Sequence, residues 1–198
     1  MRPYAPGIPG PYNHGVEIYT DGLFVSGTLS GPFKRLTDVI NRRDEEYMLV
    51  YEASITPVGQ AANPRRLATP VLVGRSHVHI VAGSPGAGAQ PQTEAAPREF
   101  HVPKTPVPCF ALTDTFSVYG TAHLLQGSTL DSFLRVGDIF VPVTGATIYL
   151  NSMPGTPWQR QLVVLNKAKV QVMYVLDAEH QPGTHGGAPA QGQEPGGG

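Results

Sequence analysis

The sequence predicts a mainly β fold in which one β-β-α-β-β module is used twice. Three observations lead to this prediction. Four blocks of sequence recur in the same order, strand-like runs of apolar residues dominate each copy, and Gly and Pro gather beside and between the copies. The repeat is the most informative of the three, because an internal repeat defines the architecture of a chain before any single element does.

The repeat is recognised by a nearly constant offset between its blocks. Residues 20–28 align with residues 113–121 at an offset of 93, and the later blocks follow at offsets of 92 to 94. These later blocks pair residues 36–40 with 130–134, residues 53–55 with 146–148, and residues 71–75 with 163–167. Blocks that keep their order and spacing in this way predict a duplication, with the two copies forming a pseudo-symmetric pair.

Each copy opens with a predicted hairpin. In the first copy, strand-like residues 16–19 and 23–29 flank Thr20-Asp21-Gly22, where Asp followed by Gly favours a tight turn. The second copy has Asp114-Thr115 at this place, so its turn is expected to be looser.

A short helix is expected next in each copy. Leu36, Val39 and Ile40 follow the i, i+3, i+4 spacing of a helix face. The same spacing recurs at Leu130, Phe133 and Leu134. Ser128 and Asp131 resemble a capping box, which predicts where the second helix begins.

Strand-like runs complete each module. They cover residues 47–55 and 71–81 in the first copy, and residues 139–150 and 162–175 in the second. The resulting division is a flexible segment (1–15), module 1 (16–82), a Pro/Gly/Ala-rich linker (83–106), module 2 (107–176) and a disordered tail (177–198). Modules this small bury a modest core, so we expect them to pack together, continue each other's sheet or form a larger homo-oligomer.

Composition restricts the function classes. Fourteen basic and fifteen acidic residues give a formal net charge of −1, without the basic excess that is typical of nucleic-acid binding proteins. The single cysteine, Cys109, excludes an intramolecular disulfide framework and fits a reducing compartment. Neither a signal peptide nor a membrane span is recognised, so a cytoplasmic protein without a membrane partner is expected.

Two stretches resemble the signatures of Sm-like small β-barrels. Residues 16–29 match the first signature, a strand, a polar-Gly turn and a second strand with the inner Gly27. Residues 71–81 are similar to the second signature. The resemblance implies two Sm-like barrels, although Sm proteins place their helix before the first strand. The tandem layout also resembles an uncharacterised bacterial domain-of-unknown-function family, which implies a fold and no activity.

The resemblance also suggests where RNA would bind. Sm-like proteins hold RNA with an Asn or Asp in one loop and an Arg-Gly pair in another. The nearest positions here are Asn41 and Arg75, which become Arg135 and Lys167 in the second copy.

The candidates for chemistry are few. His77 and His79 would share a strand face suited to a metal, but Lys169 and Gln171 replace them in the second copy. A polar, solvated face is therefore the favoured interpretation, and no metal or cofactor is expected. Cys109 is expected to be a buried structural thiol, because a reactive one needs an accessible, electropositive setting. No nucleophile elbow, phosphate loop or other catalytic constellation is found, so the chain is expected not to be an enzyme.

Eight residues are the candidate contacts for nucleic acid or a protein partner. They are Arg42, Arg43, Arg65, Arg66, Arg75, Trp158, Arg160 and Lys167. Acidic residues follow Arg43 directly, so a mixed-charge solvated surface is the favoured interpretation of the basic pairs. Trp158, the only tryptophan, is either an interaction anchor or packed back onto its own barrel.

The sequence therefore favours a non-enzymatic interaction or scaffolding protein that associates with itself through sheet edges and loops. The alternative is a protein that binds RNA or single-stranded nucleic acid.

Overall fold

The computed structural model describes residues 12–42, 44–59, 63–84, 102–135 and 137–176, and in these residues the chain is mainly β, as expected. The first half contains β1 (Tyr12–Thr20), β2 (Leu23–Gly31), α1 (Leu36–Ile40), β3 (Tyr47–Pro57), β4 (Arg65–Arg66), β5 (Val71–Gly74), the 3-10 helix η1 (Arg75–His77) and β6 (Val78–Gly83). The second half contains β7 (Lys104–Leu112), β8 (Phe116–Leu125), α2 (Leu130–Arg135), β9 (Phe140–Leu150), β10 (Met153–Asn166), the 3-10 helix η3 (Lys167–Lys169) and β11 (Val172–Val175).

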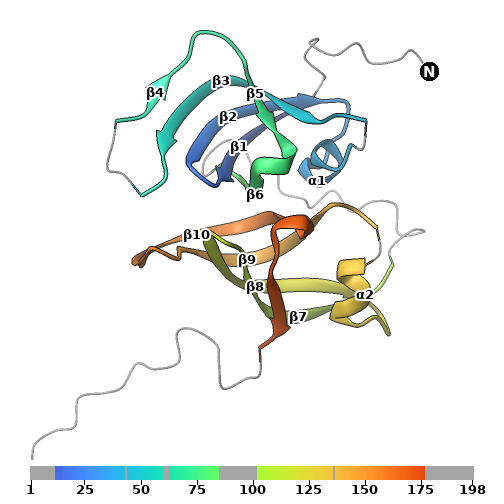
Figure 1. Ribbon diagram of the computed structural model, residues 1–198. Coiled ribbons are helices and arrows are strands. Elements are labelled where there is room, and N and C mark those ends of the chain that lie inside the picture. Colours follow the sequence, from blue (N-terminus) through green and yellow to red (C-terminus); the bar gives the residue numbers. More distant parts are fainter. Residues whose placement is uncertain (1–11, 43, 60–62, 85–101, 136, 177–198) are drawn as a thin grey trace, which may run out of the picture.

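The strands form one antiparallel sheet of eleven strands. Its order is β11-β7-β8-β9-β10-β6-β1-β2-β3-β4, and β5 pairs with β3 beside β4. The first half lies above the second in Figure 1, and the halves meet where β6 pairs with β10. The sheet is open, because β11 and β4 stand at opposite ends of the strand order. The halves thus continue each other's sheet, and the described strands form no closed barrel.

Strands β2 and β8 each bend at a glycine. A Cβ atom at Gly27 would lie 2.6 Å from the carbonyl oxygen of Tyr51, and one at Gly120 would lie 2.5 Å from Cγ1 of Val143. The pairing register shifts at both places, which marks a bulge. Only glycine fits this close approach of two strands, and the bends curl each half of the sheet around its own core.

A threonine side chain closes the turn of each opening hairpin through a hydrogen bond. Thr20 Oγ1 accepts from the Leu23 amide at 3.0 Å, and Thr113 Oγ1 accepts from the Phe116 amide at 2.9 Å. Three residues separate β7 from β8, whereas two separate β1 from β2. The second turn is therefore longer, in agreement with its lack of the Asp-Gly pair.

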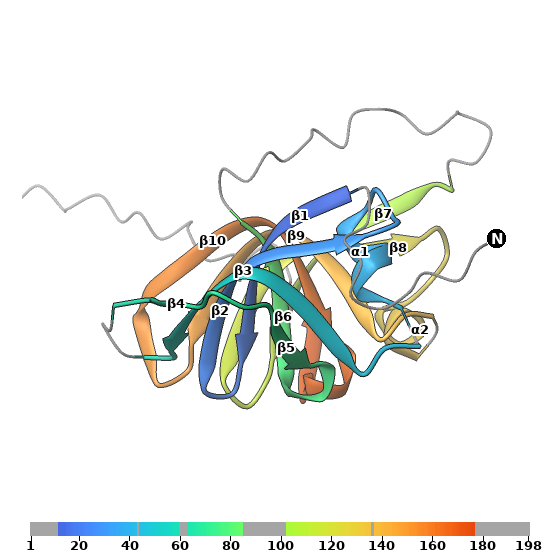
Figure 2. The same ribbon diagram turned by 90° about the horizontal axis from the view of Figure 1, so that it is seen from above.

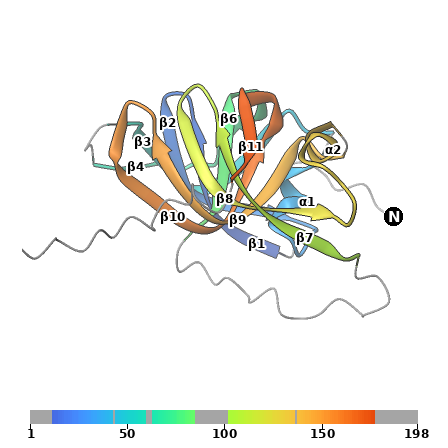
Figure 3. The same ribbon diagram turned by 90° about the horizontal axis from the view of Figure 1, so that it is seen from below.

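Both predicted helices are present, but the expected cap of the second is wrong. The reciprocal bonds at its start join Thr129 and Ser132, at 3.0 and 3.2 Å, rather than Ser128 and Asp131. Asp131 instead pairs with Arg135 one turn later. Figures 2 and 3 show α1 and α2 on one side of the molecule, and β4 with the β9–β10 hairpin on the opposite side.

The interior is divided into two apolar clusters, one for each half. Each half also ends with a 3-10 turn between two strands, so the long strands expected over residues 71–81 and 162–175 are interrupted. Residues 1–11, 85–101 and 177–198 of the predicted flexible segment, linker and tail lie outside the described residues, whereas β1 begins at Tyr12 and β7 at Lys104, inside the predicted segment and linker. In the part of the chain that is described, no helix is long and apolar enough to cross a membrane.

Candidate functional site: the seam and the two free edges

The seam between the halves is a strand pair with buried side chains on both faces. Its register pairs Val163 with Ala82, Val164 with Val81, and Leu165 with Ile80. All six side chains are fully buried. Each half also lends residues to the core of the other, since Phe140 and Val164 join the first cluster while Tyr19 and Ile80 join the second. The seam is thus built like a protein interior.

Two asparagine side chains lock the seam at the backbone. The Asn41 amide donates to the Phe140 carbonyl and its oxygen accepts from the Phe140 amide, both at 2.9 Å. Asn166 donates to the Val78 carbonyl at 2.8 Å and to the Arg75 carbonyl at 3.3 Å. Asn41, which the Sm-like resemblance places near RNA, therefore uses its amide group to join the two halves.

A largely buried charged pair also crosses the seam, six residues along β10 from Asn166. Arg160 on β10 donates through Nε to the Glu17 carboxylate on β1 at 2.5 Å, and Tyr19 donates its hydroxyl proton to the same oxygen at 3.1 Å. Burial raises the pKa of Tyr19 far above its usual range, and the neighbouring Glu17 carboxylate raises it further. Tyr19 therefore stays neutral and acts as a donor here.

The prediction of a solvated face carrying two histidines is wrong. His79 is fully buried, with Nε2 at 2.5 Å from Asp21 Oδ1, and its ring stands edge-on to Phe116 of the second half. Lys169 approaches the same Asp21 carboxylate at 3.6 Å. His77 lies in η1 and not on a strand, so the two imidazoles do not alternate along one. Among the described residues, no group of three His, Cys, Asp or Glu side chains could hold a metal ion.

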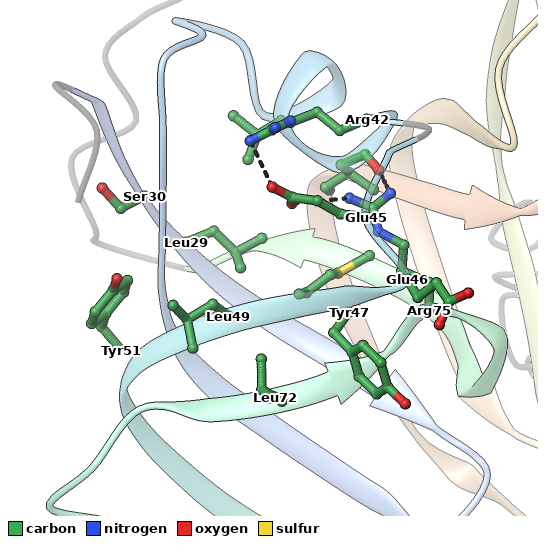
Figure 4. A pocket seen from close by; sticks show the side chains of 13 residues that line it. Leu29, Ser30, Arg42, Glu45, Glu46, Tyr47, Leu49, Tyr51, Leu72 and Arg75 are labelled. Atoms are coloured by element: carbon green, nitrogen blue, oxygen red, sulfur yellow. Dashed lines mark hydrogen bonds and ion pairs between the residues drawn. The ribbon is translucent and has the colours of Figure 1, made fainter. Parts of the chain in front are cut away.

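Arg42 and Arg75, two of the eight candidate contacts, meet around one carboxylate. Arg42 pairs with Glu45 at 2.7 Å, and Arg75 approaches the same group at 3.9 Å while it donates to the Ile40 carbonyl. These residues line a cavity of about 230 Å³ next to β5, shown in Figure 4. Both guanidinium groups therefore already face acceptors of this chain.

The other candidate contacts are spread over several elements. Arg65 and Arg66 are exposed on β4, Arg160 belongs to the seam, and Lys167 is half-buried at the start of η3. Trp158 packs on Tyr19 of the first half, with ring centroids 5.9 Å apart. Arg43 lies outside the described residues. Contact of these residues with nucleic acid or a partner stays a prediction.

Three strands of the described sheet have an outer edge with no strand beside it: β11, β5 and the two-residue β4, which carries only Arg65 and Arg66. The edges of β11 and β5 are the apolar ones. They carry several of the most exposed large apolar side chains, including Leu72, Val172 and Tyr174. Exposed apolar edges of this kind favour pairing with a further strand.

The register of the free edges repeats that of the seam. Leu72 faces Leu49 across β5 and β3 at the place where Val164 faces Pro142 across β10 and β9. Val172 faces Leu112 at the place where Ile80 faces Tyr19. Leu72 is 64% and Val172 47% exposed, whereas Val164 and Ile80 are fully buried at the seam.

The helices show the same difference between a covered and an uncovered end. In α1 all three apolar residues are buried, and Asn41 directly after it is bonded to β9 across the seam. In α2 no residue is buried, and Leu130, Phe133 and Leu134 are half-exposed. The apolar side of α2 thus lacks the neighbour that α1 has.

Sequence reasoning did not single out Leu72 or Val172, and it named Asn41 only as a position that the Sm-like resemblance places near RNA. A signal for Leu72 was present, because the repeat aligns it with Val164 inside a fully apolar run. No comparable signal marks Asn41, whose partner is 99 residues away.

The fold and the edges define a class: an open antiparallel sheet protein with a seam between two similar halves and an unpaired, apolar strand edge at each end. No family model, curated protein or solved structure matches the chain.

Proposed function

We propose that this chain is a non-enzymatic scaffold that associates head to tail with copies of itself, with β11 of one copy pairing with β5 of the next. The observation that carries the proposal is the shared register of seam and free edges. Transferred to two copies, the seam register pairs Leu72 with Met173 and Val73 with Val172. The exposed Leu72 and Val172 would then become buried, as Val164 and Ile80 are at the seam.

The uncovered helix supports the same arrangement. Tyr47 is 53% exposed and faces Gly74 across β3 and β5, at the place where the buried Phe140 faces Asn166. Phe140 is the residue that lies against the end of α1. In a head-to-tail pair, Tyr47 of one copy would approach the end of α2 in the other. One contact would thus cover the exposed edge residues and the apolar side of α2 together.

The two unpaired edges, β11 and β5, differ from each other, and this difference determines the form of the assembly. A contact between unlike surfaces repeats from copy to copy, so it produces a ring or a filament and not a closed two-fold dimer. The seam inside each chain would be one contact in this series, and the contact between chains would be the next.

We further propose that the halves are two Sm-like modules related by duplication. The shared order of elements, the threonine-closed hairpins and the glycine bends of β2 and β8 support this relation. An Sm-like ancestry would place the first signature at β1–β2 and the second at β5–β6. The helix after the second strand remains a departure from the Sm pattern.

The mass of the full chain in solution tests the association. We expect light scattering to give a mass that rises well above 21.1 kDa with concentration. Leu72→Glu places a charge on the exposed edge without disturbing the core, and it should return the mass to that of one chain. Leu23→Glu changes another exposed leucine, at the β1–β2 turn, and should have no effect. A wild-type chain that stays monomeric at high concentration contradicts the proposal.

A crosslinking experiment tests the register. Leu72→Cys and Met173→Cys chains, mixed with a short thiol crosslinker, should give a product of twice the chain mass, whereas each variant alone should give none. Cys109 is buried and should not react. A product from Leu72→Cys alone would show that like edges meet, and it would contradict the head-to-tail arrangement.

A further inference from the structure

A second feature of the seam is an open apolar groove. It has a volume of about 410 Å³, and four aromatic side chains line it: Tyr19, Phe24, Phe116 and Trp158. Tyr19 stands at the centre, with its ring centroid 5.1 Å from Phe24, 5.6 Å from Phe116 and 5.9 Å from Trp158. Tyr19 and Phe116 are fully buried, so the partly exposed Phe24 of the first half and Trp158 of the second are the rings that a ligand can touch.

The lining of the groove is uncharged and mostly apolar, with Thr56 and Thr156 as polar members. Pro57 and Pro64 contribute from the first half, and Met153, which is 56% exposed, contributes from the second. None of the lining residues is charged. This lining does not suit phosphate groups or acidic peptides, which need cationic partners. It suits an extended apolar peptide, because aromatic-lined grooves recognise proline-rich segments in the polyproline II conformation.

The chain itself contains such a segment. Pro3, Pro6 and Pro9 recur at intervals of three residues, in a stretch outside the described residues. A polyproline II helix has three residues per turn, so prolines with this spacing lie on one side of it. We infer that the groove binds residues 3–9 of another copy of this chain, with the prolines against the partly exposed rings of Phe24 and Trp158.

The distance that residues 3–12 can span decides whether the bound prolines come from the same chain or from another copy. Tyr12 and Tyr19 lie at opposite ends of β1, about 24 Å apart at about 3.4 Å per residue. At about 3.1 Å per residue, an extended segment brings Pro3 about 28 Å from Tyr12, but Pro6 only about 19 Å. Within one chain only Pro3 can reach the groove, so all three prolines can bind there only from a second copy.

Trp158 provides the readout, because it is the only tryptophan and it lines the groove. The receiver is the full chain with Pro3, Pro6 and Pro9 changed to Ala, so that its own segment does not compete. The probe is a synthetic peptide of residues 1–12, which contains no tryptophan. We expect a saturable change in Trp158 emission, and binding at least about tenfold weaker for the peptide with the three prolines changed to Ala.

Matched receivers locate the binding. Met153→Glu on the exposed rim should weaken binding, whereas Leu125→Glu, also exposed but outside the groove, should not. Leu72→Glu should bind the peptide as well as the receiver does, so this contact can fail or succeed independently of the strand pairing proposed above. No emission change at millimolar peptide, equal binding of the alanine peptide, or equal binding by Met153→Glu would each overturn the inference.

Discussion

The two hydrogen bonds of Asn41 should make a large contribution to the stability of the seam. Asn41→Ala removes both bonds to the Phe140 backbone and leaves a buried amide and a buried carbonyl without these partners. A net loss of about 1 kcal/mol per bond, with a penalty for the groups left unpaired, gives a destabilisation of about 2 to 4 kcal/mol.

Urea unfolding followed by Trp158 fluorescence measures this loss, because Trp158 packs on Tyr19 across the seam. With a slope of about 2 kcal/mol per molar urea, the midpoint should fall by about 1 to 2 M. Both chains should also carry Leu72→Glu, so that association between copies does not contribute to the transition.

The matched control is Arg135→Ala, because Arg135 is the residue of the second half that the repeat aligns with Asn41. Its side chain is exposed and pairs with Asp131 on the same helix, so its removal should leave the midpoint unchanged. If Asn41→Ala unfolds at the same urea concentration as Arg135→Ala, the reasoning that these bonds stabilise the seam is refuted.

Three further outcomes are expected. Gly27→Ala places a methyl group 2.6 Å from a backbone oxygen and should lower thermal stability by about 1–3 kcal/mol, whereas Gly22→Ala meets nothing within 4 Å and should be tolerated. The His79 hydrogen bond lowers the pKa of Asp21 below 3.8, so the stability that wild type has over Asp21→Asn should be complete above that pH and disappear as pH falls through the lowered pKa; an equal difference at all pH values contradicts this. Burial raises the pKa of Cys109, so its thiol should react with Ellman's reagent only after unfolding, and rapid labelling of the folded chain would contradict its burial.

Local patterns in the sequence predicted most of the elements. The spacing of Leu36, Val39 and Ile40 gave the first helix, because a helix face depends only on residues a few positions apart. The buried strand position of Cys109 was likewise predicted from its apolar neighbours. Such features need no knowledge of the rest of the chain.

The histidines show why the alternation rule failed. The β1–β6 register moves from Tyr19 opposite Ile80 to Thr20 opposite Val78, so His79 is the extra residue of a bulge. A bulge changes which face a side chain takes, and the strand period no longer applies across it. A strand pattern read from sequence alone does not contain this shift.

The contacts of the seam could not be read from the sequence for another reason. Glu17 and Arg160 are 143 residues apart, and Asn41 and Phe140 are 99 apart. No periodicity connects positions so distant, and a mixed-charge surface was the simplest interpretation of the arginines. The repeat does align Leu72 with Val164. The structure shows that this equivalent position is exposed in the first half and buried in the second.

The exchange of core residues across the seam has a consequence for synthesis on the ribosome. The core of the first half includes Phe140 and Val164, so it cannot be completed when β6 emerges at Gly83. At about 5–20 residues per second, the remaining stretch of roughly 80 residues takes about 4 to 16 s to appear. During this time the edge of β6 is open to strands of other nascent chains. We expect low ribosome density to favour chains closed within themselves over swapped ones, because neighbouring nascent chains are then farther apart.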